Sequence, residues 1–453
     1  MGNLLASLQT TADSMAAVEK AIDTATNNVM NAKSAGFAKQ RLPLLAKRFE
    51  IDSGLIGGAE AGDLVSSRLR YLERSVWDQA HGWGKYAQRE SLLERLEPVF
   101  DIASGSGIAG ALDRLFQSFS QWSVNPNDTP IRQTVIDRAR DLAATFQYSA
   151  ASLAEAREDI QNELASVLEK INRVGEQIRQ FNLEIRQDVR TQWDAGLDAH
   201  IHTQLEELAE YVDFDVLRGD DGAYTVNLGG QTPLVMGERF HPISADFSSG
   251  QAVILDFRGQ DVTSQFQQGR LFSLVDVHNN FVPGVMQDLD LLAQSLADDI
   301  NSALQSGLDR NGLPPAVDLF TYNTTTGPAA SLSITAILPN ELAGAIATAP
   351  GGNGNALNLA ALATSKQVND FTYTQYYGFV AGRAGRELAN ARKDEYSQSL
   401  LLAQARNLRA EKTEVSLDEE AANLIVFQRQ YQANAEMVRI LNELTGTVID
   451  LIR

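Results

Sequence analysis

The sequence contains no cysteine and no long hydrophobic run among its 453 residues. Without thiols, the chain can form no disulfide, no thiolate zinc site and no cysteine nucleophile. No stretch approaches the roughly 20 apolar residues that a membrane-spanning helix needs. The first basic residue is Lys20, so no positively charged segment precedes an apolar core as it does in a cleaved secretory signal. We therefore expect neither a transmembrane helix nor a cleavable signal.

Basic residues are scarce as well, with 38 Lys and Arg against 58 Asp and Glu and a net charge of −20. This charge repels nucleic acid phosphates and anionic lipids, so nucleic acid and membrane are poor partners and we expect neither. The acidic excess lies in the middle of the chain, because residues 1–50 carry six basic and four acidic groups and residues 405–453 carry six and eight. Terminal segments with nearly balanced charge can pack closely. The alternative is that this distribution of charge arose by chance.

Apolar residues near the start recur in alternating steps of four and three residues, which is the spacing of a coiled-coil seam. This first seam consists of Leu4, Leu8, Thr11, Met15, Val18, Ile22, Ala25 and Val29. A second seam near the end consists of Leu417, Leu424, Tyr431, Val438 and Ile452 at one position and Phe427, Leu441 and Val448 at the other. Ser416 and Glu419 form a capping box that starts this last helix. Each stripe is too narrow to bury itself, so each helix needs a partner helix.

The middle of the chain combines long helical patterns with a β-rich stretch. We expect a helix from Pro130 to residue 187, since its apolar seam meets no further proline, and about 1.5 Å per residue makes it a rod of roughly 85 Å. Alternating apolar residues on both sides of the turn sequence RGDDG predict a β-hairpin over 212–228. Further strands are expected over 251–257 and 331–338. Helical patterns return over 285–304 and from 388 to the end.

These patterns predict a mainly α, elongated multi-domain fold with a β-rich insertion. The terminal segments 1–50 and 405–453 are expected to pair as coiled-coil helices. Residues 51–205 and 275–404 are expected to form an elongated helical rod domain, and residues 206–274 a β-rich outer insertion.

Candidate catalytic and ligand sites are weak. Residues 105–110, GSGIAG, match the G-x-G-x-x-G pattern of dinucleotide sites, but that pattern needs a buried strand before it and LLERLEPVF (92–100) reads as helix. His200 and His202 are close in sequence, yet residues two apart diverge on a helix. We expect no catalytic residue, no metal and no cofactor. A nucleotide-binding enzyme that uses the 105–110 loop is the distant alternative.

Two terminal signatures carry a family resemblance. NNVMNAKSAGFAKQR (27–41) resembles the NNIANANTPGY signature of bacterial flagellar axial proteins, which are the rod, hook and hook-associated components. It matches at Asn27, Asn28, Asn31, Gly36 and Phe37, where Phe replaces the usual Tyr. SLDEEAANLIVFQRQYQANAEMV (416–438) resembles the C-terminal signature of the same family. Its matching residues are Leu417, Asp418, Glu419, Glu420, Asn423, Leu424, Phe427, Gln428, Tyr431, Ala433, Asn434 and Ala435.

Internal stretches narrow the resemblance to the hook-associated members of the family. NPNDTPIRQTVIDRARDLAATF, LAEYVDFDVLRGDDGAYTVNLGGQTPLV and PGGNGNALNLAALA are similar to segments of the proteins at the hook–filament junction. The resemblance implies a structural adaptor, not an enzyme, that is secreted and joins the hook to the filament outside the cell. A second junction protein or a hook-like axial component is the alternative within the family.

The resemblance also implies how the ends work. In this family the N- and C-terminal helices pair and stack into an inner tube, and the asparagine-rich phrase marks the end of the first helix, where Gly36 permits a left-handed turn. The residues expected to pack between subunits are Leu8, Met15, Ile22, Val29, Asn27, Asn28, Gly36, Phe37, Leu424, Phe427, Tyr431, Asn434, Val438 and Leu441. The implied partners are further copies in a ring, the hook protein, the second junction protein and a flagellar export chaperone that binds the C-terminal helix. Export would follow the flagellum's own channel.

Two departures from the family pattern matter. Thr413-Glu414-Val415 stands where the family usually has Ser-Gly-Val, so the sharp break before the last helix loses its usual glycine and only the Ser416 cap remains. Little sequence lies between Asn311 and Ser331, so we expect an outer β domain to be reduced or absent.

Overall fold

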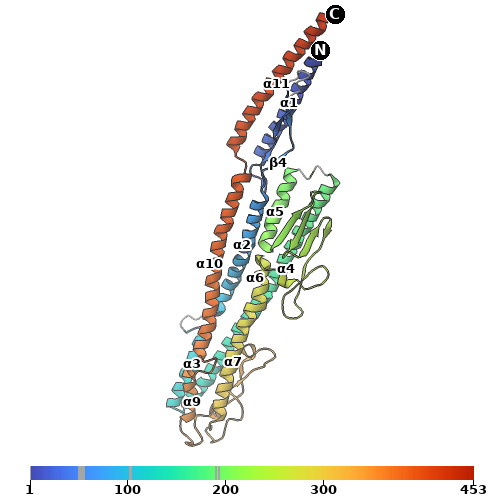
Figure 1. The fold of residues 1–453 in the computed structure, drawn as a ribbon. Coiled ribbons are helices and arrows are strands. Elements are labelled where there is room, and N and C mark those ends of the chain that lie inside the picture. Colours follow the sequence, from blue (N-terminus) through green and yellow to red (C-terminus); the bar gives the residue numbers. More distant parts are fainter. Residues whose placement is uncertain (1, 49–56, 101–104, 189–190, 192–193, 453) are drawn as a thin grey trace. The chain divides into compact units, whose positions relative to one another are not determined.

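The chain divides into two compact units, each built from separate stretches of sequence. The computed structural model describes residues 2–48, 57–100, 105–188, 191 and 194–452 (Figure 1). Unit 1 comprises residues 1–83, 170–242 and 398–453, and unit 2 comprises residues 84–169 and 243–397. Three helices contribute residues to both units: α2 (Arg70–Leu96), α4 (Thr129–Gln187) and α10 (Tyr373–Thr413).

Unit 1 pairs the two ends of the chain. Helices α1 (Gly2–Asn31) and α11 (Leu417–Ile452) lie side by side (Figure 1). Two antiparallel ribbons follow α1. Strand β1 (Gln40–Arg41) pairs with β4 (Val65–Ser66), and β2 (Leu44–Ala46) pairs with β3 (Ala59–Ala61). Strand β3 also contacts α1, since Ser14 Oγ accepts a hydrogen bond from Ala59 N at 3.0 Å.

Unit 1 also contains a four-stranded antiparallel sheet in the order β5–β6–β7–β8. Its strands are β5 (Phe214–Arg218), β6 (Tyr224–Leu228), β7 (Thr232–Met236) and β8 (Arg239–Phe240). The hairpin predicted around RGDDG is therefore confirmed, with Val216 opposite Val226. Asn182 of α4 fixes the sheet, because its side chain donates to Tyr224 O (2.8 Å) and accepts from Tyr224 N (2.7 Å). Helix α5 (Ala195–Tyr211) precedes the sheet and is capped by Asp194, which accepts from Leu197 N.

Unit 2 is a helical body with short β elements. Its own helices are α3 (Gly107–Val124), α6 (Gly269–Asp276), the π-helical turn Val277–Phe281, α7 (Val282–Gln305), α8 (Pro328–Ser331) and α9 (Gly354–Ala361), with 3-10 turns at Glu97–Phe100, Thr263–Gln265, Pro339–Glu341 and Leu362–Thr364. Strand β9 (Ser244–Asp246) pairs with β10 (Val253–Leu255), and β11 (Phe320–Thr321) pairs with β12 (Ser333–Ile334). Trp122, Phe119 and Tyr373 are among its largest fully buried side chains.

The mainly α fold with β elements agrees with the sequence patterns, and α4 runs over Thr129–Gln187 as expected. Two expectations, one strand and one domain, need correction. The strand expected over 331–338 comprises only Ser333–Ile334. Leu332 and Ile337 are buried, but they lie in irregular chain on either side of it. The single insertion expected over 206–274 begins inside α5 and divides between the units, with β5–β8 in unit 1 and β9–β10 in unit 2. The domain boundary expected at residues 50 and 51 lies outside the described residues.

Candidate functional site: the terminal helix pair and its polar joint

One face of α11 is turned toward α1 and carries the seam that the sequence predicts. Between residues 421 and 450, nine side chains are half-buried and all the others are exposed. The half-buried residues are Asn423, Leu424, Phe427, Tyr431, Asn434, Val438, Leu441, Thr445 and Val448. From Leu424 onward they follow steps of three and four, as in a coiled coil. Every expected packing residue of α11 therefore lies on this face, where it packs within the chain.

Helix α1 buries a stripe that only partly coincides with the one that its apolar periodicity predicts, since the two share Val18 and Ala25. The buried residues are Ser14, Ala17, Val18, Ala21, Ala25 and Asn28. Among the expected packing residues, Leu8, Met15 and Ile22 are half-buried and Val29 is 37% exposed. The buried face is rotated because α1 packs against strand β3 as well as α11, and small side chains let these neighbours approach closely.

A buried polar cluster lies where α1 ends and α11 begins. The side chain of Asn28 donates to Gln40 O and accepts from Gln40 N, both at 2.9 Å. It also donates to Glu420 Oε2 at 3.3 Å. Lys39 Nζ lies 2.8 Å from Glu419 Oε2 and 2.9 Å from Glu420 Oε1. Burial opposes the charge of Lys39, but the bonds with Glu419 and Glu420 outweigh it and raise the pKa of Lys39 above its usual value.

The asparagine-rich segment that begins at Asn27 has a defined geometry. Helix α1 ends at Asn31, whose side chain donates to Asn27 O at 3.0 Å. Gly36 has φ +72°, and a Cβ there would lie 2.5 Å from Ala199 O of α5. Glycine is therefore required at this position both by the left-handed backbone and by the close approach of α5. Phe37 is half-buried, whereas Asn27 is exposed.

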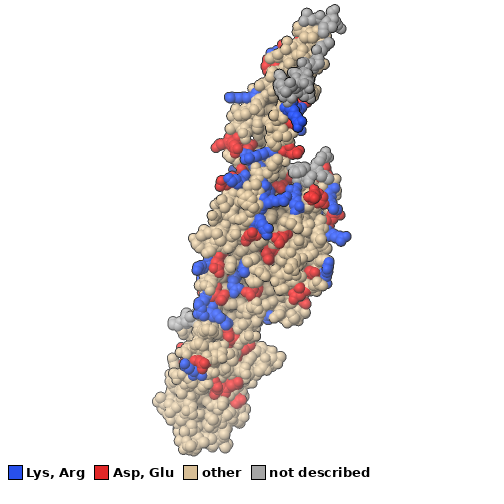
Figure 2. All heavy atoms as spheres, in the orientation of Figure 1, with Lys and Arg blue, Asp and Glu red and all other residues tan. Residues whose placement is uncertain are grey.

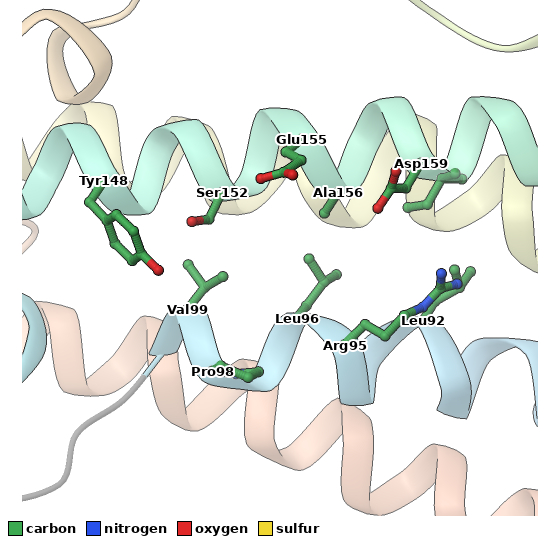
Figure 3. A pocket seen from close by; sticks show the side chains of 11 residues that line it. Leu92, Arg95, Leu96, Pro98, Val99, Tyr148, Ser152, Glu155, Ala156 and Asp159 are labelled. Carbon is green, nitrogen blue, oxygen red and sulfur yellow. The ribbon is translucent and has the colours of Figure 1, made fainter.

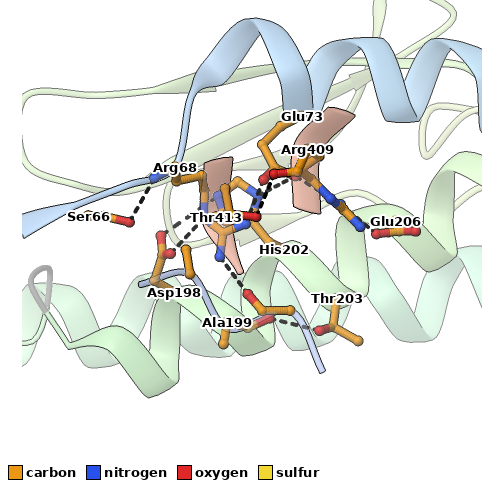
Figure 4. Close-up of polar contacts among 12 residues, drawn as sticks. Ser66, Arg68, Glu73, Asp198, Ala199, His202, Thr203, Glu206, Arg409 and Thr413 are labelled. Carbon is orange, nitrogen blue, oxygen red and sulfur yellow. Dashed lines mark hydrogen bonds and ion pairs between the residues drawn. The ribbon is translucent and has the colours of Figure 1, made fainter. Parts of the chain in front are cut away.

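A second group of charges joins this turn to three helices (Figure 4). Arg68 donates to Gly36 O (2.6 Å), Glu73 Oε1 (2.7 Å) and Asp198 Oδ2 (2.8 Å). The Glu73 side chain is only 1% exposed and also accepts from Arg409 Nη1 at 3.1 Å. The buried Glu73 carboxylate is thus bound by two guanidinium groups, which compensates its burial better than one ion pair would.

Arg409 belongs to this group of charges, and His202 lies beside it. Arg409 also binds Glu206 Oε2 at 2.7 Å. Burial alone would raise the pKa of Glu206, but Arg409 and Arg406 outweigh it and hold that pKa below its usual value. His202 lies beside the ion pairs, and burial, followed by the charges of Arg68, Arg409 and Arg218, lowers its pKa well below its usual value. His202 is therefore neutral. We call residues 28, 36–40, 68, 73, 409, 413, 419 and 420 together the polar joint.

The break before the last helix persists without the family's glycine. Helix α10 ends at Thr413 and α11 begins at Leu417. Thr413 O accepts from Lys39 N at 2.9 Å, and Ser416 Oγ accepts from Glu419 N at 3.4 Å. The chain therefore breaks here without the family's usual glycine. The hydrogen bond from Lys39 and the predicted Ser416 cap hold the break instead. Glu419 directs its carboxylate to Lys39.

Helix α11 also carries apolar residues outside its seam. Val426, Met437, Ile440 and Leu444 are 51%, 55%, 43% and 48% exposed. At roughly 100° per residue, they lie on one face about a quarter turn from the seam. We call these four residues the outer stripe. Two grooves of about 460 and 520 Å³ follow the α1–α11 pair, the first lined by Phe427 and Asn28 and the second by Met437 and Ser14, among others.

The glycine-rich loop has a structural explanation. Gly105 and Gly107 have positive φ, and a Cβ on Gly110 would lie 2.4 Å from Gly105 O. In the described part of the chain, the elements before the loop are helix α2 and the turn Glu97–Phe100, and neither is the buried strand that a dinucleotide site needs. Among the described residues, no three His, Asp or Glu side chains form a group that could hold a metal ion. No helix in the described part of the chain is both long and apolar enough to cross a membrane.

Unit 2 contains a separate cavity of about 260 Å³ between the end of α2 and α4 (Figure 3). Apolar side chains such as Leu96 and Val99 face Glu155 and Asp159 across it. Arg95 also lines the cavity, and its guanidinium pairs with Glu163 at 2.7 Å.

The sequence predicted the seam of α11, Asn28 and Gly36, but not the charges around them. Lys39 and Gln40 stand inside the quoted N-terminal signature, and Glu420 inside the C-terminal one, without any local sign that they meet. Arg68, Glu73 and Arg409 lie outside both signatures. Their partners are more than 100 residues away in several cases, as with Arg409 and Glu73.

Comparisons with known proteins agree with this architecture. Residues 93–320 match the family model of the flagellar hook-associated protein FlgK helical domain, and residues 409–451 match that of the flagellar basal body rod FlgEFG protein C-terminal region. Flagellar hook-associated protein 1 of Bacillus subtilis is 24% identical over 98% of this chain and 97% of its own length. The Salmonella typhimurium protein of the same name is 24% identical over 65% of this chain and 56% of its own length.

A solved structure shows the same fold. The flagellar hook junction protein FlgK from Burkholderia pseudomallei superposes with a TM-score of 0.68 at 15% identity, over 76% of this chain and all of that one. The helical-domain family alone matches half of the 453 residues. This chain belongs to the flagellar hook-associated protein FlgK family, and it is a structural component of the flagellum and not an enzyme.

Proposed function

We propose that this chain joins the hook to the filament outside the cell by assembling with further copies of itself through α1 and α11. The observation that carries the proposal is the outer stripe. A two-helix pair needs only one apolar seam, and the seam between α11 and α1 already uses Phe427 and Val438. The outer stripe lies outside this seam and is about half exposed, and a neighbouring copy would cover it.

The energy of such a contact is favourable. Burial of one large aliphatic side chain contributes about 1.5–3 kcal/mol, so burying the four residues of the outer stripe would stabilise each contact substantially. The two grooves beside the α1–α11 pair provide space for side chains of the neighbouring copy. A ring of copies repeats the contact at every subunit.

Assembly with flagellar components follows from the family, and specific partners belong to the proposal. These partners are the hook protein, the second junction protein and an export chaperone that covers the C-terminal helix before assembly. The terminal segments 1–50 and 405–453 make the contacts, and the sheet of strands β5–β8 remains outside the assembly contact. The exposed apolar residues of α11 support the chaperone contact, since an uncovered apolar stripe favours aggregation during export.

The experiment separates the outer stripe from the seam. Ile440→Asp and Met437→Asp should abolish motility and filament attachment in a strain that lacks the gene, because a buried unpaired charge costs several kcal/mol. Asn442→Asp is the matched control, since Asn442 is exposed and polar on the same helix. Phe427→Asp and Val438→Asp should also prevent assembly, but they should disturb the α1–α11 pair in the free chain as well. Normal filaments with both outer-stripe variants would contradict the proposal.

A further inference from the structure

The cavity of unit 2 between the end of α2 and α4 has an apolar lining that the assembly proposal does not use (Figure 3). It measures about 260 Å³. Leu92, Leu96 and Ile160 line it and are buried, and Val99 and Ala156 line it and are half-buried. A concave surface of aliphatic side chains is suited to the hydrocarbon part of a ligand.

A row of carboxylates lies along the α4 side of this cavity. Glu155, Asp159 and Glu163 follow one another at intervals of four residues, so their side chains lie on one face of the helix. Glu155 and Asp159 are exposed and line the cavity. Like charges four residues apart destabilise a helix, and a cation bound beside them would relieve this repulsion.

The charge of the row exceeds that of the cation bound to it. Arg95 Nη2 lies 2.7 Å from Glu163 Oε2. Among the described residues, Glu155 and Asp159 form no ion pair. Three carboxylates therefore face one guanidinium, which leaves a surplus of two negative charges whichever carboxylate Arg95 binds.

The other cations of the surrounding helices do not change this count. Arg157 lies two residues from both Glu155 and Asp159, so it points to another side of α4, where it donates to Gly250 O. Arg89 is bound to two carboxylates of other elements, and Arg392 of α10 is bound to three carboxylates of α2 and the turn after it. These guanidiniums are already compensated or directed elsewhere.

We propose that this cavity binds an arginine-bearing segment of a partner protein other than this chain. The guanidinium of that arginine pairs with Glu155 and Asp159, and its aliphatic stem packs on Leu96 and Val99. A long cationic side chain combines these two properties, and a guanidinium binds carboxylates through paired hydrogen bonds. Charge complementarity favours this occupant over a second copy, because a chain with a net charge of −20 repels its own acidic surface. The cavity lies in unit 2, apart from the outer stripe, so the inference goes beyond the assembly proposal.

The test uses the full-length protein with labelled valine methyl groups and three blocked peptides. These are acetyl-Gly-Leu-Arg-Gly-amide and its counterparts with Gln or Glu in place of Arg. Each peptide is titrated while the methyl signals are followed by NMR, with Val99→Ile to assign the signals of Val99. The Arg peptide should shift these signals with a Kd at least tenfold lower than that of the Gln peptide, and the Glu peptide should have no effect.

Variants of the row test the assigned carboxylates. Glu155→Gln and Asp159→Asn should each weaken the Arg peptide about threefold, which is the effect of losing one exposed ion pair. Glu158→Gln is the matched control, since it removes an exposed carboxylate of α4 that is not in the lining, and it should change the Kd by less than twofold. Ser152→Phe places a ring in the cavity and should abolish the shift.

Other occupants give different results. Equal affinity for the Arg and Gln peptides, or no shift at Val99 with either, would overturn the proposal. A shift of the same signals by calcium chloride alone would also overturn it, because the row would then bind a metal ion. Val99 signals that change with protein concentration would do the same, since a second copy would then occupy the cavity. The peptide comparison on the unaltered chain decides the question even if a variant fails to fold.

Discussion

Asn28 on α1 pairs with Gln40 through both polar atoms of its side chain, donating to the Gln40 carbonyl and accepting from its N–H at 2.9 Å in each case. The Asn28 side chain acts as a neighbouring strand would, because it bonds both the backbone N–H and the backbone carbonyl of Gln40. Gln40 also pairs with Ser66 of β4. The end of the first helix is thereby fixed to the β1–β4 ribbon that follows it within unit 1.

Replacement of Asn28 by alanine should destabilise the polar joint. Asn28 and Gln40 are both buried, so Asn28→Ala leaves the Gln40 N–H and carbonyl without partners, at a cost of about 3 kcal/mol. Amide exchange of residues 38–41 should rise by at least tenfold. Asn27→Ala is the control, since Asn27 is exposed one residue earlier, and it should change exchange there by less than threefold. Equal effects of the two variants would contradict the assigned role of Asn28.

Gly36 should be intolerant of a side chain for two separable reasons. Gly36→Ala introduces a left-handed alanine and a Cβ 2.5 Å from Ala199 O, so α5 must move. Gly237 is the matched control, because it has φ +57° and open space around the missing Cβ. Gly237→Ala should lower the free energy of unfolding by about 1 kcal/mol, which is the backbone penalty alone. Gly36→Ala should lower it by at least twice as much in urea unfolding. Similar losses of unfolding free energy in the two variants would show that α5 can move away from the new Cβ without further destabilisation.

Lys39 should be needed only while Glu420 is charged. Lys39→Met leaves the buried Glu420 carboxylate without its cation, which should cost about 3 kcal/mol of unfolding free energy. The double variant Lys39→Met/Glu420→Gln should recover at least half of that loss, since Gln still accepts a hydrogen bond from Asn28. Lys47→Met, at the more exposed pair of Lys47 with Asp13, should cost less than about 1 kcal/mol. No recovery in the double variant would show that Lys39 acts through packing instead.

The parts of this protein that follow a local rule could be predicted from the sequence. The seam of α11 was predictable, because Phe427, Val438 and Leu441 combine the correct period with large apolar side chains. The buried face of α1 was predictable only in part, at Val18 and Ala25, since Ser14 and Ala17 are small and hydropathy gives them little weight. Their burial follows from strand β3, whose contact with α1 depends on tertiary structure.

The polar joint shows a second limit of sequence reasoning. Glu73 and Arg409 form an ion pair across 336 residues of sequence, and neither side chain has a pattern that indicates its partner. The break at Thr413 illustrates the same limit, because a hydrogen bond from Lys39 compensates for a glycine that the family usually supplies. Periodicity predicts which face of an element is buried, but it does not predict which distant charge will meet that face.

Unit 1 should lose stability in mild acid because it contains buried histidines. Burial lowers the pKa of His81 to about 4 from a usual value of 6.5, and its ring packs edge-on against Phe214 at 5.1 Å. The unfolded chain binds a proton at His81 below about pH 6.5, whereas the folded chain does not until about pH 4, so the free energy of unfolding falls as the pH decreases through this window. A full shift of this size corresponds to about 3 kcal/mol, or about 1.4 kcal/mol per pH unit. His202, whose pKa is also lowered by burial, changes stability in the same direction.

Urea unfolding at pH 7 and pH 5 tests this assignment while remaining above the usual pKa of glutamate. The free energy of unfolding of the wild-type chain should fall by at least about 2 kcal/mol from pH 7 to pH 5. The decrease in His81→Phe should be about 2 kcal/mol smaller, because phenylalanine cannot bind a proton in the unfolded chain. His200→Phe is the matched control at an exposed histidine of α5, and it should keep the wild-type difference between the two pH values. The comparison uses the difference between the two pH values for each variant, so a change in packing that is independent of pH cancels. An unchanged difference in His81→Phe would show that the acid sensitivity arises elsewhere, with His202 beside the polar joint as the next residue to replace.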